Sequence, residues 1–103
     1  YRSKFLGKYK FTVDHIIWSA SGTRLDKIYY YFGEIRKGDE ERTIYINFCK
    51  DSDPEVKIYE DGTISDINNT LFGEFSSNKE VNFTYDVRSP GGGNIYNVRG
   101  DKE

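Results

Sequence analysis

The side chains best suited to acid–base or nucleophilic chemistry are scarce, since the chain holds one histidine, His15, and one cysteine, Cys49. His15 follows Asp14, but neighbours in a strand point to opposite faces, so adjacency cannot make them a catalytic dyad. One histidine and one distant cysteine also fall short of the roughly four ligands that zinc requires. We expect His15 to be a structural residue, at the surface or partly buried. Cys49 follows the inward-facing Phe48, so strand phase predicts a small packing residue on the outer face.

Two segments carry ligand-like residue patterns but lack the rest of the corresponding motif. Asp51, Asp53 and Glu55 are spaced two residues apart. An EF-hand loop also needs a glycine at its sixth place and a glutamate at its twelfth, and Pro54 interrupts this run. Pro90–Gly93 leads into a strand-like segment, whereas a phosphate-binding loop continues as Gly-Lys-Ser/Thr into a helix. The sequence predicts a solvated turn and a bulged hairpin here, with no catalytic residue, no metal and no cofactor.

Tyrosine gives the strongest functional signal. Tyr29 and Tyr31 share one face of an expected strand, and Tyr30 shares the other face with Ile28 and Phe32. At most one of these sets fills the core, and the sequence leaves open which one. The outer set forms an aromatic stripe, which suits sugar rings or protein partners or else serves only cross-strand pairing within the sheet. The candidate ligand-binding residues are Tyr29, Tyr31, Tyr45 and Trp18.

Length and composition limit the class of protein that can position these residues. A chain of 103 residues suffices for one domain, residues 1–103, and is too short for two separate cores. Its 17% aromatic residues can build a core although only 36% of the chain is hydrophobic. A net charge of −2 lacks the basic character of a nucleic-acid binder, so no nucleic-acid partner is expected. No apolar run reaches the roughly 18–20 residues of a membrane helix.

Period-2 alternation of apolar and polar residues dominates the chain and indicates antiparallel strands that are buried on one face. The expected strands are 8–14, 27–36, 42–49, 55–59, 63–67, 71–75, 80–87 and 94–100. The alternation breaks at His15–Trp18, which indicates a bulge or a segment covered on both sides. Short strands joined by sequential turns predict an all-β antiparallel meander of about eight strands, forming a small lipocalin-like barrel or a flattened β-sandwich.

Several short motifs resemble known β-domains. Gly7 and Tyr9, within Phe5–Phe11, resemble the start of lipocalin-like (calycin) barrels, in which Gly-x-Trp or Gly-x-Tyr opens the first strand. Other segments resemble small secreted all-β lipoproteins of gut Bacteroidetes; these are the residues Tyr29–Tyr31 with Gly33, Asp61–Gly62 and Gly91–Gly100. The resemblance implies an outer-membrane or periplasmic lipoprotein of the bacterial cell envelope. A lipoprotein leader would be removed upstream of Tyr1, and the lipidated cysteine at its end would remain as the only membrane attachment.

The resulting hypothesis is a non-enzymatic cell-envelope lipoprotein domain, monomeric, that binds a glycan or a protein partner through exposed aromatic residues. One alternative is a carrier that holds a small apolar ligand inside the barrel, with a cavity near Phe11, Ile46, Phe83 and Val98. A second alternative is an inhibitor or structural adaptor that acts through loops at Ser19–Thr23 and Ser89–Gly93.

The two faces of the strand around Tyr30 can be told apart by stability. If Tyr29 and Tyr31 fill the core, replacing both with alanine should cost about 3 kcal/mol or more, because large-to-small core substitutions leave cavities. Denaturant unfolding of the double variant measures this cost. Nearly unchanged stability would place both side chains on the surface.

Overall fold

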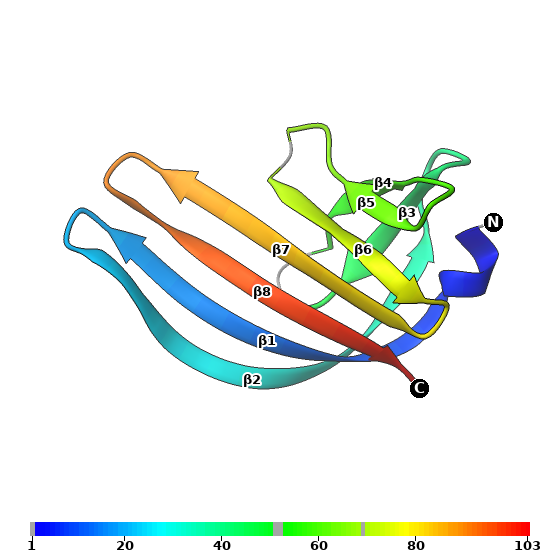
Figure 1. Ribbon diagram of the computed structural model, residues 1–103, viewed down its shortest axis with the longest axis horizontal. Coiled ribbons are helices and arrows are strands. Elements are labelled where there is room, and N and C mark those ends of the chain that lie inside the picture. The colour runs from blue at the N-terminus through cyan, green and yellow to red at the C-terminus, as the bar shows by residue number, and fades with distance from the viewer. Residues whose placement is uncertain (1, 51–52, 69) are drawn as a thin grey trace.

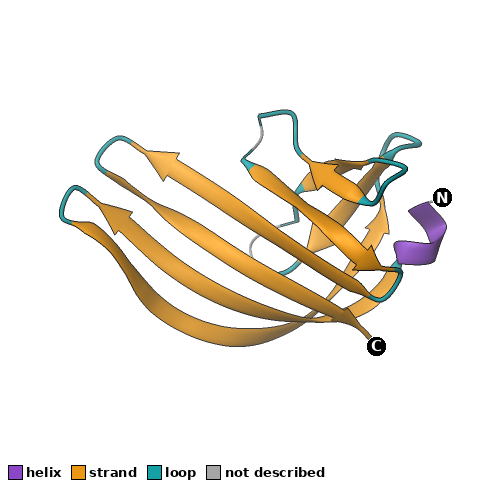
Figure 2. Ribbon diagram, in the orientation of Figure 1, coloured by secondary structure: helices purple, strands orange, loops and turns teal. Residues whose placement is uncertain are grey.

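The computed structural model describes residues 2–50, 53–68 and 70–103, which form eight antiparallel strands and one 3₁₀ turn (Figure 1; Figure 2). The elements are η1 (Arg2–Phe5), β1 (Gly7–Ser19), β2 (Gly22–Lys37), β3 (Thr43–Asn47), β4 (Glu55–Ile58), β5 (Thr63–Ser65), β6 (Leu71–Ser77), β7 (Glu80–Ser89) and β8 (Gly92–Lys102). The predicted all-β meander of about eight strands is confirmed.

The strands form one sheet that closes in a ring. Each strand pairs with the next along the chain, and β8 pairs with β1, Tyr9 lying opposite Lys102 and Ser19 opposite Gly92. The two chain ends therefore meet, and Lys102 Nζ donates a hydrogen bond to the carbonyl of Lys4 at 3.0 Å. The sheet is therefore continuous around the ring.

The core lies inside the ring and follows the alternation of the sequence. Tyr9, Phe11 and Val13 of β1 are fully buried, as are the inward residues of β3, Ile44 and Ile46. The other members of the buried cluster are Phe5, Ile35, Phe48, Val56, Ile58, Ile64, Leu71, Phe75, Val81, Phe83 and Val98. Burying this apolar surface is the main favourable contribution to folding, at roughly 25 cal/mol per Å².

One glycine is required by how closely the core packs. Gly100 of β8 lies opposite Phe11 of β1 and opposite Val81 of β7. A Cβ at this position would come within 2.8 Å of the Phe11 ring and of Val81 Cγ1. The missing side chain thus leaves the space that the Phe11 ring fills, and any larger residue would overpack the core.

Two hairpins extend beyond the ring. β1 continues to Ser19 and β2 starts at Gly22, so the predicted loop Ser19–Thr23 is reduced to Ala20–Ser21. At the end of the other long hairpin, only Pro90–Gly91 joins β7 to β8. In Figure 1 these hairpins project to the left, away from the short strands β3–β6. Both predicted loops are thus two-residue turns between long strands.

The irregularity predicted within His15–Trp18 is confirmed as a shift in the β1–β2 register between His15 and Ile16. His15 lies opposite Lys27 and Ile16 opposite Leu25, which leaves Asp26 as the extra residue on β2. An extra residue bends the strand that carries it and raises its twist. The bulge thus sits on β2, across from the sequence break that indicated it.

The phenol of Tyr9 is the most enclosed hydroxyl group of the first strand. The side chain is fully buried, and its hydroxyl donates a 2.7 Å hydrogen bond to the carbonyl of Phe5 in η1. Burial raises the pKa of Tyr9 from 10.0 to about 12, because the phenolate would lose its hydration. Tyr9 thereby ties η1 to the sheet in its neutral form.

This shift predicts a pH dependence of stability. Between pH 10 and 12 the unfolded chain has lost the Tyr9 proton and the folded chain has kept it, so the free energy of unfolding falls as pH rises. Tyr9→Phe should cost about 1 kcal/mol near neutral pH by losing the hydrogen bond, and the difference between the two proteins should shrink above pH 10. Urea unfolding at a series of pH values measures this, with Tyr30→Phe as an exposed control. Parallel curves for the protein and Tyr9→Phe would contradict the assignment.

Candidate functional site on the outer face of the sheet

The predicted binding residues of β2 face the inside of the molecule. Tyr29 and Tyr31 lie opposite Val13 and Phe11 of β1, and both are half-buried against the core cluster. The Tyr31 hydroxyl donates a 3.3 Å hydrogen bond to Asn47 Oδ1. Burial raises the pKa of Tyr29. These two tyrosines therefore pack against the core. For the variant in which both are replaced by alanine, we expect the loss of about 3 kcal/mol or more in the free energy of unfolding.

The other two predicted aromatic residues are engaged in separate contacts. The Tyr45 hydroxyl donates a 2.7 Å hydrogen bond to Asp39 Oδ2, which raises the pKa of Tyr45 to about 12. The guanidinium of Arg36 lies 5.2 Å from the Tyr45 ring centroid. Trp18, near the end of β1, carries the guanidinium of Arg88 at 5.4 Å from its ring centroid. Each ring is already covered on one side by a cation from the same chain.

The exposed aromatic stripe is formed by the alternate residues of β2. Ile28, Tyr30 and Phe32 are 57%, 64% and 68% exposed and point to the outer face. The sequence analysis left open whether Tyr29 and Tyr31 or the alternate residues of this strand face outward. In the structure the alternate residues Ile28, Tyr30 and Phe32 do. Lys10 of β1 lies with Nζ 4.4 Å from the Tyr30 ring centroid.

His15 is partly buried, but its partner is not its neighbour in sequence. Its Nδ1 lies 3.3 Å from Asp26 Oδ2, and its Nε2 lies 2.8 Å from Asn94 Oδ1. The ring stacks on Tyr96 with centroids 4.7 Å apart. Asp26 reaches His15 because the bulge places it beside that residue. The contacts hold together β1, β2 and β8 at the base of the projecting hairpins, as suits a structural histidine.

Cys49 departs from the expected position. It is half-buried and packs against the core cluster, so the prediction that it faces outward is wrong. Strand phase does not apply to it, because β3 ends at Asn47. Of the acidic run, Asp51 lies outside the described residues, Asp53 pairs with Arg36, and Glu55 accepts a 2.7 Å hydrogen bond from Thr43 Oγ1. The described carboxylates of this run thus have protein partners.

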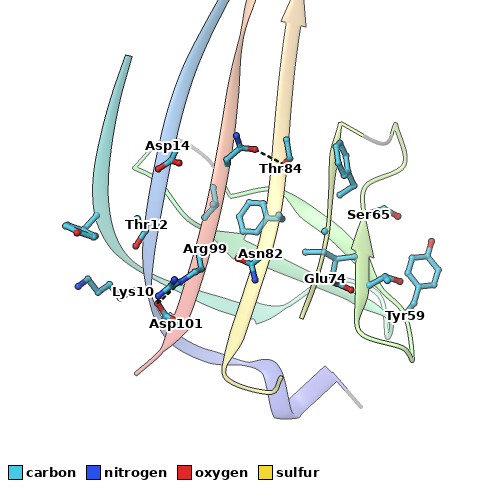
Figure 3. A pocket seen from close by; sticks show the side chains of 18 residues that line it. Lys10, Thr12, Asp14, Tyr59, Ser65, Glu74, Asn82, Thr84, Arg99 and Asp101 are labelled. Atoms are coloured by element: carbon cyan, nitrogen blue, oxygen red, sulfur yellow. Dashed lines mark hydrogen bonds and ion pairs between the residues drawn. The ribbon is translucent and has the colours of Figure 1, made fainter. Parts of the chain in front are cut away.

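A groove of about 1100 Å³ lies on the outer face of β1, β8, β7, β6 and β5 (Figure 3). One row of side chains crosses it from strand to strand: Thr12 lies opposite Arg99, Arg99 opposite Asn82, Asn82 opposite Glu74, and Glu74 opposite Thr63. Figure 3 shows the first four of these side chains in succession. At about 4.8 Å per strand the row spans roughly 19 Å.

A second row runs parallel to the first, two residues away from it on each strand. It consists of Asp14, Asn97, Thr84, Phe72 and Ser65, each opposite the next in the ladders. Thr84 Oγ1 donates a 2.9 Å hydrogen bond to Asn97 Oδ1. Residues opposite each other in adjacent strands lie within about 5 Å, so the two rows make a continuous floor that is polar except for Phe72.

Aromatic rings stand at both ends of this floor. Tyr30 lies opposite Thr12 at the β2 end, and it is 64% exposed. Phe72 of β6 and Tyr59, which follows β4, line the other end and are 50% and 46% exposed. The groove therefore has aromatic rings at its two ends, with Lys10 Nζ 4.4 Å from the Tyr30 ring centroid, and hydrogen-bonding groups between them.

The charges lining the groove nearly cancel. Lys10 and Arg99 supply two positive charges, and Asp14, Glu74 and Asp101 supply three negative ones, for a net of −1. Arg99 is held by Asp101, with Nη2 3.3 Å from Oδ2. A phosphate-rich ligand would find no excess of positive charge here.

The interior that a carrier would use is occupied by side chains. Phe11 and Ile46 are fully buried, Phe83 and Val98 are 4% exposed, and all four belong to the same packed cluster. Phe48 makes an edge-on contact with Phe83 at 5.2 Å between ring centroids. Close packing of this kind leaves little room for a ligand, and it gives the carrier alternative no support.

Sequence reasoning missed the floor of the groove. Thr12, Asn82, Thr84 and Asn97 occur as the polar members of alternating strands, which is also the pattern of any solvated face. The sequence could have shown only that these residues face outward, since each of them alternates with a buried neighbour such as Phe11 or Phe83. Phase alone does not say which residues of different strands stand side by side.

Comparisons with known proteins return no match to a family model, to a curated protein or to a solved structure. The lipocalin-like and lipoprotein resemblance therefore stays a prediction. None of the helical segments among the described residues is long or apolar enough to cross a membrane.

If the floor residues do not stabilise the fold, replacing them should change the free energy of unfolding very little. Asn82→Ala should change the free energy of unfolding by less than about 0.5 kcal/mol. Phe83→Ala, one residue away and facing inward, should cost about 3–5 kcal/mol. Chemical denaturation of both variants provides the test. A large loss from Asn82→Ala would show that the floor residues hold the sheet together.

Proposed function

We propose that the outer groove binds a glycan, and that the protein is a binding domain without catalytic activity. The observation that carries the proposal is the polar floor of Thr12, Asn82, Thr84 and Asn97 between the exposed rings of Tyr30 and Phe72. A sugar ring has an apolar C–H face and a rim of hydroxyl groups. Aromatic rings suit the face, and amides and hydroxyls suit the rim because they both donate and accept.

Charge favours an uncharged or weakly charged ligand. The net charge of −1 from five ionisable side chains in the groove gives no strong attraction for sulfate, phosphate or nucleic acid. Each carboxylate or guanidinium can still bond to hydroxyl groups, and charge-assisted bonds are the stronger kind. A neutral saccharide uses all of these groups without leaving a ligand charge unpaired.

Size favours an oligosaccharide. The floor crosses five strands, about 19 Å at 4.8 Å per strand, and the rings of Tyr30 and Phe72 stand near its opposite ends. A ligand that meets both rings must extend over most of that length. The setting in the bacterial cell envelope belongs to the same proposal and rests on the resemblance of the sequence to small secreted lipoproteins.

A panel of immobilised polysaccharides and oligosaccharides, followed by calorimetry on the hits, tests this proposal. We expect Phe72→Ala and Asn82→Ala each to weaken binding of the selected glycan about tenfold or more, which corresponds to about 1.4 kcal/mol. Tyr45→Ala is the matched control, because Tyr45 is an aromatic residue that does not line the groove.

Two outcomes would overturn the proposal. One is no binding to any member of a broad panel. The other is a glycan whose affinity falls with Tyr45→Ala or Trp18→Ala but not with Phe72→Ala or Asn82→Ala, which would move the site to the aromatic residues that the sequence selected.

A further inference from the structure

The edge of β2 is a second exposed feature of the fold, and it shares Tyr30 with the proposed groove. β3 pairs with β2 only over Glu34–Lys37, and among the described residues no strand lies along the remaining edge, Gly22–Phe32. Figure 1 shows this part of β2 as the outermost strand of the projecting sheet. An open edge presents a row of backbone donors and acceptors to which another strand can pair.

The hydrogen-bond pattern shows which residues supply those groups. The amide of Gly38 donates to the carbonyl of Thr43 at 2.9 Å, so residue 38 directs its backbone toward β3. Alternate residues of a strand direct their backbone groups to the same side. Ile28, Tyr30 and Phe32 therefore present their N–H and C=O groups to the open edge, and the intervening residues present theirs to β1.

The same three residues carry the exposed apolar side chains. Ile28, Tyr30 and Phe32 all point to the outer face and are more than half exposed. Backbone groups and apolar side chains are thus available together over Ile28–Phe32. A partner strand there would gain main-chain hydrogen bonds and apolar contact in one step.

Two features limit the usable segment and give it a centre. On one side the bulge at Asp26 interrupts the strand, and on the other the Glu34–Asn47 pair begins the β3 ladder. Tyr30 lies midway between Asp26 and Glu34. An antiparallel pair of β2 strands centred on Tyr30 would bring Asp26 of one copy opposite Glu34 of the other, where two negative charges and the bend of the bulge end the pairing.

We propose that two copies of this chain pair through β2, antiparallel, with Tyr30 opposite Tyr30. Ile28 then lies opposite Phe32 of the second copy on the outer face, and Tyr29 opposite Tyr31 on the inner face. All three edge residues form hydrogen-bonded pairs, giving roughly six main-chain hydrogen bonds. The apolar stripe of one copy contacts the same stripe of the other, as a two-fold symmetric interface requires.

The area available indicates a reversible dimer. If a large side chain buries about 200 Å², the exposed parts of Ile28, Tyr30 and Phe32 contribute on the order of 350 Å² from each copy. Both copies then supply on the order of 700 Å² before the backbone and the inner-face tyrosines are counted, against about 1,200–2,000 Å² in a stable interface. The equilibrium should therefore depend visibly on concentration.

The symmetry axis stands normal to the sheet, so the two outer faces point the same way. The two grooves would lie side by side, and a long glycan that met both would gain avidity. This last step rests on the proposed function, whereas the dimer itself does not.

Sedimentation velocity over a range from micromolar to about millimolar concentration tests the dimer without any ligand. We expect a shift from monomer toward dimer, and Ile28→Lys and Phe32→Lys should each abolish it. Leu25→Lys is the matched control: Leu25 is an exposed aliphatic residue of the same strand, 54% exposed, but lies beyond the bulge. Thermal unfolding verifies that each variant is folded.

Disulfide trapping tests the register. In a background of Cys49→Ala, oxidised Tyr30→Cys should cross-link to itself, since hydrogen-bonded pairs have Cα atoms about 5.5 Å apart, within disulfide range. A mixture of Ile28→Cys and Phe32→Cys should give mainly the mixed dimer, and Lys57→Cys, on the exposed side of β4, should give little.

The outcomes separate the two proposals. A chain that stays monomeric at all concentrations overturns the dimer, as does a dimer that Ile28→Lys leaves intact or that Tyr30→Cys fails to trap. A dimer with these properties that binds no glycan would retain this inference and overturn the groove.

Discussion

The alternation of β1 is the constraint on which the rest of the structure depends. β1 is paired on both edges, with β2 and with β8, and its odd residues Tyr9, Phe11 and Val13 are fully buried. A shift of the register by one residue against either neighbouring strand would turn these side chains outward and bring Lys10 and Thr12 into the core. The cost of that exchange fixes the register. The registers in turn bring Thr12, Arg99 and Asn82 into one row.

Much of the fold could be predicted from the chain because local pattern and burial agree. Phe48 was predicted to face inward by alternation alone, and Ile46 and Phe83 were expected to line the interior. The long hairpins were underestimated, because Gly22–Asp26 has no apolar alternation and shows mostly polar and small residues. Local pattern also cannot predict ring closure, since closure joins residues more than seventy positions apart.

The sequence predicted that the candidate site would contain aromatic residues, but not which residues would form it. Aromatic residues of β2 were identified, yet both faces of Ile28–Phe32 are apolar, so alternation could not assign Tyr30 to the outside. The polar floor needs the registers of several ladders at once, which depend on packing inside the ring. The contact of His15 with Asp26 is a similar case, because a bulge on the neighbouring strand brings Asp26 into reach.

The pairing of β1 with β8 also bears on how the chain acquires its structure. Hairpins such as β1–β2 and β7–β8 have loops of two residues and can form early, at small entropic cost. The β1–β8 ladder must instead bring together strands separated by most of the chain, and that closure costs more entropy. During synthesis the β8-facing edge of β1 has no partner until residues 92–102 emerge. The strand that organises the finished sheet is therefore the one whose pairing is completed last.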